Sequence, residues 1–193
     1  MTFSDGTWLN PPPDTQIDAA QLTLTTGDRT DFWQDTHYGF RRDDGHFLGQ
    51  AAPDDFDAQL HFEGGFTALY DQAGLMLRQD PQNWIKAGIE VSDGLIQASC
   101  VVTRAGRSDW SVQPLGPVAP GRFGIRVIRV GAAVMVHRPE GAGWVLMRLA
   151  DFPAGPALIG PTACTPERVG LTVTFSDFSL TTPPSDPLHL SEA

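Results

Sequence analysis

A run of polar residues between Asp71 and Thr103 has the types and the spacing needed to bind a polar ligand. One carboxylate, two carboxamides and two cations recur at alternate positions within apolar stretches: Gln72, Arg78, Lys86, Glu90 and Gln97. Alternate side chains of a β-strand point to the same face of the sheet. Charged and amide groups gathered on one face can fix the hydroxyls of a ligand such as a sugar.

Two hairpins are predicted to bring these residues together. Asp93-Gly94 is typical of a two-residue type I′ turn, which would pair Ser92 with Leu95. A loop over residues 79–83 would pair Arg78 with Trp84. The two registers together predict four cross-strand rows: Gln72–Glu90–Gln97, Gly74–Gly88–Ser99, Met76–Lys86–Val101 and Arg78–Trp84–Thr103.

The opposite face of the same strands is predicted to face the core. Every residue on it is apolar or small: Ala73, Leu75, Leu77, Ile85, Ala87, Ile89, Val91, Ile96, Ala98, Cys100 and Val102. A slip of one residue would turn this whole set to the other face, so the pattern specifies the register strongly.

The row Gly74–Gly88–Ser99 is nearly bare of side chains and is expected to form a trough. Glycine weakens a strand, and the close approach of another body is a common reason for its presence. The expected contacts are polar groups on the two walls, an aromatic ring for stacking and a cation for an anionic substituent: Gln72, Glu90, Gln97 and Lys86, then Trp84, then Arg78. The alternative is an ordinary solvent face whose glycines accommodate sheet curvature.

Lys86 is the only lysine of the chain, against twelve arginines. Lysine offers a compact charge and a pKa that burial can shift, which favours a specific role, with chance as the alternative. Lys86→Met should therefore abolish binding with little loss of the fold.

Residues outside the hairpins could reach the same face. Trp110 could stack on a ligand and Asp109 could bind its hydroxyls. Alternatively, Trp110 belongs to the core and Asp109 caps a turn. His37 and Tyr38 could also reach the trough, although such a pair is more often structural.

The bulk composition predicts an all-β fold, a two-sheet antiparallel β-sandwich, as a single domain over residues 1–193. The 20 glycines and 16 prolines are scattered, which is typical of many short strands joined by tight turns. We also expect an extended arm over residues 1–13, one helical turn within residues 30–36, and a Pro-rich, loosely held tail over residues 181–193.

The net charge of −10 and the lack of a basic stripe argue against nucleic acid and an anionic membrane as partners. Residues 1–5 lack the charged and apolar regions of a signal peptide, and no apolar run is long enough to predict a membrane span. Cys100 and Cys164 form no zinc motif and no disulfide framework. A cytoplasmic protein without metal or cofactor is therefore expected.

Catalytic patterns are sparse. Glycosidases need two carboxylates about 5–5.5 Å or about 6.5–9.5 Å apart, yet neither Glu63 nor Glu90 has a second acid alternating with it. A lyase needs one base and one cation that neutralises a uronate. The candidates for these two roles are Tyr38 or His37, and Lys86 or Arg78.

Several motifs occur together in one order: Asp31-Phe32-Trp33, Tyr70-Asp71-Gln72-Ala73-Gly74-Leu75-Met76, Trp84-Ile85-Lys86-Ala87-Gly88-Ile89-Glu90, Ser108-Asp109-Trp110-Ser111 and Cys164-Thr165-Pro166-Glu167. With these motifs, residues 28–180 resemble the concanavalin A-like lectin/glucanase (jelly-roll) family of bacteria and fungi that includes the yeast regulator of enolase. The resemblance implies a jelly-roll fold and a ligand groove, and it implies no established activity.

Three hypotheses follow. The first is a non-catalytic binding domain for a carbohydrate or similar polar metabolite. The second is an enzyme related to polysaccharide lyases or hydrolases. The third is a regulatory protein-interaction domain acting on a metabolic enzyme, which the resemblance suggests.

Overall fold

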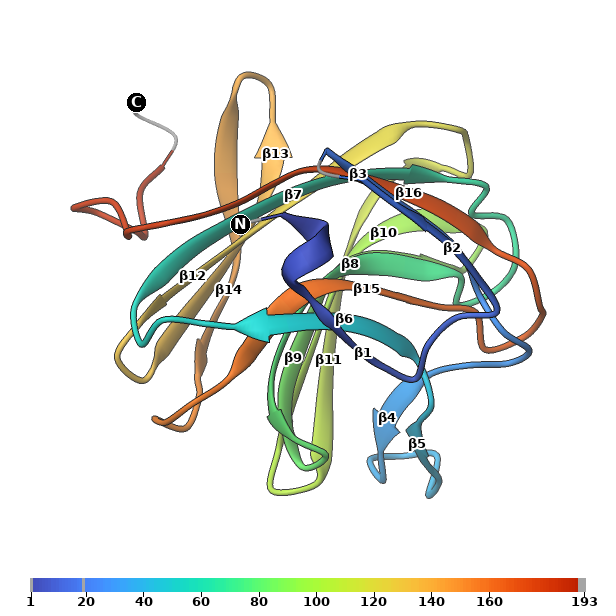
Figure 1. Ribbon diagram of the computed structural model, residues 1–193, viewed down its shortest axis with the longest axis horizontal. Coiled ribbons are helices and arrows are strands. Elements are labelled where there is room, and N and C mark those ends of the chain that lie inside the picture. The colour runs from blue at the N-terminus through green and yellow to red at the C-terminus, as the bar shows by residue number, and fades with distance from the viewer. Residues whose placement is uncertain (1, 19, 191–193) are drawn as a thin grey trace.

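The computed structural model describes residues 2–18 and 20–190, and two seven-stranded antiparallel sheets pack face to face (Figure 1). Sheet A has the strand order β1 (Thr7–Leu9), β6 (His46–Ala51), β15 (Leu158–Cys164), β8 (Gln72–Asp80), β9 (Asn83–Ser92), β10 (Leu95–Arg104) and β11 (Arg107–Pro117). Sheet B has the order β14 (Gly143–Asp151), β13 (Ala133–Glu140), β12 (Arg122–Val130), β7 (Phe56–Gly64), β16 (Thr172–Thr181), β3 (Gln21–Thr25) and β2 (Asp14–Ile17). The predicted all-β sandwich is confirmed.

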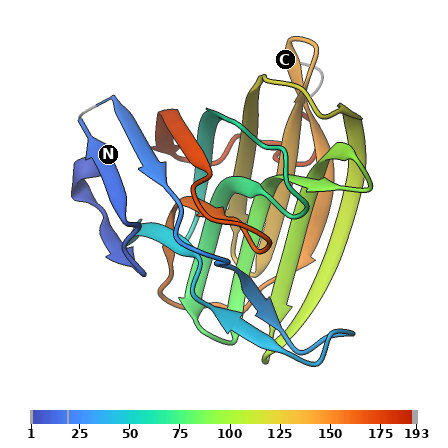
Figure 2. The same cartoon turned by 90° about the vertical axis from the view of Figure 1, so that its right-hand side faces the viewer.

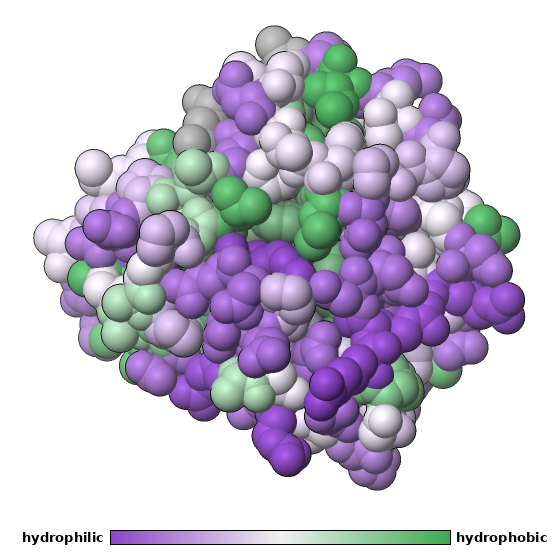
Figure 3. Space-filling model, turned by 60° about the horizontal axis from the view of Figure 1, so that its bottom comes forward, coloured by the Kyte–Doolittle hydropathy of each residue, from purple (hydrophilic) through white to green (hydrophobic). Residues whose placement is uncertain are grey.

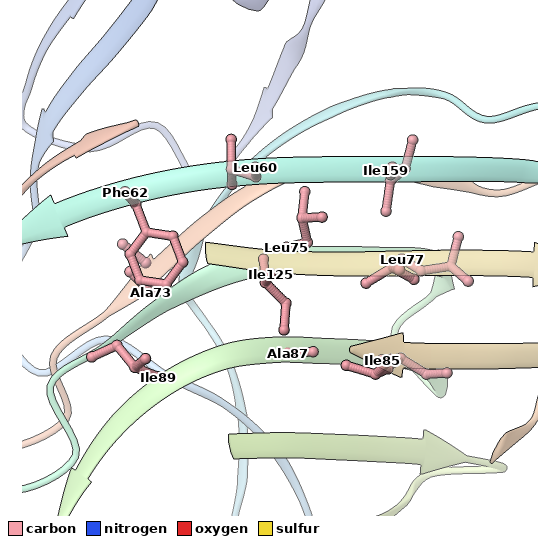
Figure 4. Packing of buried hydrophobic residues seen from close by; sticks show 14 of the residues in the cluster. Leu60, Phe62, Ala73, Leu75, Leu77, Ile85, Ala87, Ile89, Ile125 and Ile159 are labelled. Atoms are coloured by element: carbon pink, nitrogen blue, oxygen red, sulfur yellow. The ribbon is translucent and has the colours of Figure 1, made fainter. Parts of the chain in front are cut away.

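The main core lies between the two sheets. Figure 4 shows Leu60 and Phe62 of β7 and Ile125 of β12 on one side, facing side chains of β8 and β9 on the other. The whole predicted core face of β8, β9 and β10 is buried, from Ala73 to Val102. Alternation therefore identified the inward face of these strands correctly.

The predicted pairings of the two hairpins are confirmed in all four rows. Glu90 pairs with Gln97 and with Gln72, and Gly88 pairs with Ser99 and with Gly74. The loop before β9 is shorter than expected, because a bulge after Arg78 lets Asp80 pair with Asn83. Such a bulge leaves one residue, here Gln79, unpaired and shifts the register by one residue beyond it.

The helical turn predicted within residues 30–36 is wrong. The segment instead forms strand β4 (Phe32–Gln34), which pairs with β5 (Arg41–Asp43) in a two-stranded sheet. Phe32 and Trp33 are both buried, and tertiary burial of two adjacent aromatic side chains outweighs the local capping signal. In Figure 2 this hairpin (blue) and the segment after β15 (orange to red) lie in front of the strands of sheet A.

The β4-β5 hairpin and the segment after β15 together form a cover over the outward face of sheet A. Side chains of this face and of the cover pack into a second, smaller core. Its buried residues come from both the sheet and the cover: Phe32, Trp33, Phe47, Met76, Trp84, Val101 and Cys164. The alternative of an ordinary solvent-exposed face is therefore wrong for the centre of this sheet. Polar residues on this face lie between two packed layers.

Residues 2–13 are more regular than the predicted extended arm. They contain a short 3-10 helix η1 (Phe3–Asp5) and strand β1, which pairs with β6. Phe3 is buried and its ring stacks on Phe178, 5.8 Å between centroids, so an apolar side chain anchors the segment. Residues 182–190 contain no strand, and residues 1 and 191–193 of the predicted arm and tail lie outside the described residues.

The only helix in the described ranges, η1, is too short to cross a membrane. The side of the molecule that faces forward in Figure 3 is mostly hydrophilic, with small, separate apolar patches.

Candidate ligand-binding pocket

A pocket of about 220 Å³ opens between sheet A and its cover. Strands β8, β9 and β10 supply the floor, with the polar groups of Gln72, Lys86 and Glu90. Aromatic side chains from the β4-β5 hairpin, from the loop before β8 and from β11 supply most of the wall: Trp33, Tyr38, Phe40, Tyr70 and Trp110. Asp31, Val101, Pro166 and Glu167 complete the lining.

Lys86 and Asp31 form a buried ion pair at the floor. Lys86 Nζ lies 2.8 Å from Asp31 Oδ1, and the two side chains are 8% and 14% exposed. The same carboxylate oxygen accepts hydrogen bonds from the backbone N–H of Phe32 at 2.8 Å and from Gln72 Nε2 at 3.4 Å. Burial alone would lower the pKa of Lys86, but the charge of Asp31, together with Cys164, Glu90 and the hydrogen bond to Asp31, raises this pKa above its ordinary value. Lys86 is therefore a fixed cation rather than a neutral nucleophile.

Glu90 is buried beside this pair and belongs to a short hydrogen-bond chain. Ser99 Oγ donates to Glu90 Oε2 at 2.7 Å, and Trp110 Nε1 donates to Ser99 Oγ at 3.1 Å. Burial raises the pKa of Glu90 above its ordinary value, with Lys86 acting in the opposite direction. These hydrogen bonds hold the Trp110 ring at the pocket wall. Glu90 itself offers the pocket a carboxyl group that can carry a proton.

The structure requires glycine at positions 74 and 88 for a different reason from the predicted approach of a ligand. A Cβ on Gly74 would overlap the carbonyl oxygen of Ala87, and a Cβ on Gly88 would overlap that of Ala73. The approaching body is thus the neighbouring strand rather than a ligand. The space above the glycines is a small cavity of about 20 Å³, which also touches Lys86 and Ser99 and is large enough for one water molecule or one ligand hydroxyl.

Tyr70 enters the wall in a strained conformation. Its φ is +62°, in the left-handed region that bulky residues rarely adopt. Its hydroxyl lies 3.4 Å from that of Tyr38, and this contact, followed by burial, raises the pKa of Tyr70 to about 12. The phenol therefore stays protonated at neutral pH.

Asp71, the residue after Tyr70, anchors the loop before β8. Its carboxylate is fully buried and accepts from the backbone N–H groups of Thr67 (2.9 Å) and Ala68 (3.0 Å). It also accepts from Thr165 Oγ1 at 2.7 Å and from Arg168 at 2.6 Å. Burial would raise the pKa of Asp71, but these donors hold it below its ordinary value. The carboxylate thus ties the loop before β8 to the segment that carries Glu167.

Eight of the predicted site residues lie around this space. Gln72, Lys86, Glu90, Tyr38 and Trp110 line the pocket. Gly74, Gly88 and Ser99 line the small cavity beside it. These eight residues are therefore brought together, in a pocket beneath covering segments rather than in an uncovered trough.

The other five predicted positions lie elsewhere. Trp84 is 0% exposed and belongs to the second core, so its predicted stacking on a ligand is wrong. Arg78 is buried, with its guanidinium 2.8 Å from Asp43 and over the Phe32 ring, so it is not free for an anionic substituent.

Asp109 is adjacent to Trp110 on β11, so its side chain points to the opposite face of the sheet. There it forms an ion pair with Arg148 of sheet B at 3.0 Å. Gln97 is buried beside the carbonyl of Ser92, outside the pocket lining. His37 is exposed and packs edge-on against Tyr38, 5.0 Å between ring centroids.

Val101 was predicted on this face of the sheet but not as a site residue, and sequence reasoning missed the six remaining residues of the lining: Asp31, Trp33, Phe40, Tyr70, Pro166 and Glu167. All six are in loops or in the β4-β5 hairpin, outside the alternating strands. Five of them, all but Phe40, occur in the motifs that suggested the family resemblance, so the motifs were the available signal. In residues 2–18 and 20–190, no three His, Cys, Asp or Glu side chains are grouped so that they could hold a metal ion.

The chain is similar to a yeast protein over nearly its whole length. It is 48% identical over 189 residues to "Regulation of enolase protein 1" of Saccharomyces cerevisiae (strain ATCC 204508 / S288c), which covers 97% of this chain and 94% of the relative. A crystal structure of a functionally unknown protein from Saccharomyces cerevisiae superposes with a TM-score of 0.90 at 46% identity, covering 96% of this chain and 100% of that one.

More distant structures share the fold only. The GH43 protein BlXynB from Bacillus licheniformis gives a TM-score of 0.65 at 14% identity, over 92% of this chain and 37% of that one. An alginate lyase from Klebsiella pneumoniae gives a TM-score of 0.53 at 12% identity, over 88% of this chain and 84% of that one. The family described as "Protein of unknown function (DUF1349)" matches residues 8–183, which is most of the sequence. The chain therefore belongs to the DUF1349 family.

Proposed function

We propose that this chain is a binding domain for a carbohydrate or a similar polar metabolite, held in the pocket between sheet A and the β4-β5 hairpin. The observation that carries the proposal is the combination of an aromatic wall with a floor of Lys86, Asp31 and Glu90. The C–H face of a sugar ring packs on aromatic rings, while its hydroxyls both donate and accept. The floor offers an ammonium donor and carboxylate acceptors side by side.

The size of the pocket supports a small ligand. Its 220 Å³ is below the roughly 300–1,000 Å³ of pockets that enclose drug-sized molecules. We therefore expect a ligand of about one sugar ring, with one hydroxyl directed toward the small cavity above Gly74 and Gly88. A longer chain would have to leave the pocket past the exposed Tyr38 and Phe40.

A thermal-shift screen against monosaccharides, followed by calorimetric titration of the hits, tests the proposal. A ligand at a hundredfold excess over its dissociation constant adds about 2.7 kcal/mol, which is a shift of roughly 5–10 °C for a domain of this size. Trp110→Leu should weaken binding about tenfold, because it removes a stacking surface and the donor to Ser99. Trp144→Leu is the matched control, because Trp144 is also half-buried but lies on β14 of sheet B. No shift with any ligand of the panel, or equal losses in both variants, would contradict the proposal.

The lyase hypothesis has less support than binding. It requires a cation free to neutralise a uronate, whereas Lys86 is paired with Asp31 and Arg78 with Asp43. It also requires a base: of the two candidates, His37 lies outside the pocket lining, whereas Tyr38 lines the pocket with its hydroxyl 3.4 Å from that of Tyr70. Incubation with polyuronates, followed by ultraviolet absorbance of unsaturated products, is the direct test.

A second candidate function is regulation of a metabolic enzyme by direct contact. The name of the 48% identical yeast relative supports it, as do two exposed aromatic side chains at the pocket mouth, Tyr38 at 46% and Phe40 at 44%. Exposed aromatics at the edge of a cleft are typical of protein contact sites. Co-elution of the chain with purified enolase in size-exclusion chromatography, lost in the double variant Tyr38→Ser/Phe40→Ser, would favour this function over small-molecule binding.

A further inference from the structure

We infer that the pocket selects its ligand by charge, accepting neutral or amine-bearing polyols and rejecting uronic acids and sugar phosphates. The inference rests on the proposed function for the ligand class, but the electrostatic part concerns the pocket alone. Three carboxyl groups line the pocket, Asp31, Glu90 and Glu167, against the single ammonium of Lys86.

Among the described residues, Lys86 is the one cation of the lining, and Asp31 already neutralises its charge. The Lys86 ammonium and Asp31 are 2.8 Å apart, so their charges cancel at the distance of an incoming ligand. One negative charge then remains on Glu167, and Glu90 contributes a second whenever it is ionised. The pocket is therefore negative in either protonation state of Glu90.

The arginines near the pocket do not change this balance. Arg78 is paired with Asp43 at 2.8 Å, Arg168 with Asp71 at 2.6 Å and Arg41 with Asp35 at 2.7 Å. None of these guanidinium groups belongs to the lining of the pocket in the described part of the chain. An anionic ligand would thus enter a space with excess negative charge and find no unpaired cation.

The aromatic wall acts in the same direction. Ring faces carry partial negative charge and attract cations. Five aromatic side chains in the lining therefore favour an ammonium substituent over a carboxylate. We expect an amine-bearing sugar to bind at least as tightly as its neutral parent, and the corresponding uronate to bind at least about tenfold more weakly.

The test has two arms, of which the first needs no ligand. Fluorescence quenching of Trp110 by caesium and by iodide, at equal ionic strength, reports the sign of the potential at the wall. The Trp110 contribution is the difference between the unmodified chain and Trp110→Phe, with Trp144→Phe as control. We expect caesium to quench Trp110 more than iodide does, relative to free tryptophan. The double variant Glu90→Gln/Glu167→Gln should reduce this preference, whereas Glu63→Gln on β7 of sheet B should not.

The second arm measures binding of glucose, glucosamine and glucuronate by calorimetric titration. Binding of the first two without glucuronate, together with the caesium preference, supports both proposals. A caesium preference with no sugar bound refutes the proposed function but keeps the charge selection. A preference for iodide, or tightest binding of glucuronate, overturns the charge selection whatever the outcome for the other sugars.

Discussion

Replacement of Lys86 by Met should destabilise the fold severely. The ammonium is 2.8 Å from Asp31, and the side chains are 8% and 14% exposed. Removal of one partner from a buried ion pair costs about 3–5 kcal/mol, because the other charge stays buried without compensation. Asp31 keeps its hydrogen bonds from Phe32 and Gln72, so we expect the lower end, about 3 kcal/mol. This is a large part of the 5–15 kcal/mol that is typical of a whole domain.

Urea unfolding at pH 7 measures the effect. The double variant Asp31→Asn/Lys86→Met removes both charges and should recover about 2 kcal/mol relative to Lys86→Met. Arg104→Met is the matched control, since Arg104 and Asp151 are 48% and 75% exposed and their pair should contribute less than about 0.5 kcal/mol. An unchanged urea midpoint for Lys86→Met, or a double variant no more stable than the single one, would refute the buried pair as the reason for the cost.

Three further predictions concern stability. Gly88→Ala should lower the free energy of unfolding by more than about 2 kcal/mol, measured by thermal unfolding, because the added Cβ would overlap the neighbouring backbone. Gly65→Ala, with open space around it, should cost less than about 0.5 kcal/mol, and equal costs would contradict the close approach of strands β8 and β9. Burial of His137 lowers its pKa to about 4, so the unfolded chain binds a proton at a higher pH than the folded one does. The free energy of unfolding should therefore fall by about 2–3 kcal/mol between pH 6.5 and pH 4. His137→Phe should remove this pH dependence, and an unchanged slope would contradict the role of His137. Asp71→Asn should lower the free energy of unfolding by about 2–4 kcal/mol and increase proteolysis of the loop around Tyr70, and an unchanged digestion pattern would argue against its positioning role.

Local signals predicted the geometry of the central hairpins well. The Asp93-Gly94 turn and strict alternation fix which residues face each other, since both depend on neighbours within a few residues. The same rules predicted the core face from Ala73 to Val102 without error. These features need no knowledge of the rest of the chain.

The cover over the second face was not predictable in the same way. Lys86 meets Asp31 across 55 positions of sequence, and Arg78 meets Asp43 across 35. A polar face is normally a solvent face, so Trp84 was expected to be accessible. No local pattern indicates that residues 31–43 fold back over it, because that packing depends on long-range contacts of Phe32 and Trp33.

The expectation that Lys86→Met would abolish binding with little loss of stability depended on an exposed lysine. The burial of this lysine replaces it with the opposite expectation for stability. A loss of ligand binding in that variant would therefore not separate a direct contact from unfolding. Trp110, half-buried at the wall, is the more informative position.

The isolation of Lys86 also makes it a reporter of transient opening. It is the only lysine in the sequence, and it is 7% exposed beneath the β4-β5 hairpin. Because its ammonium lines the pocket, an acylating reagent must enter the pocket or wait for the hairpin to lift from sheet A, so the rate of lysine acylation in the native protein measures access to the pocket floor. A ligand seated in the pocket would have to slow the reaction, which turns one chemical label into a measure of occupancy.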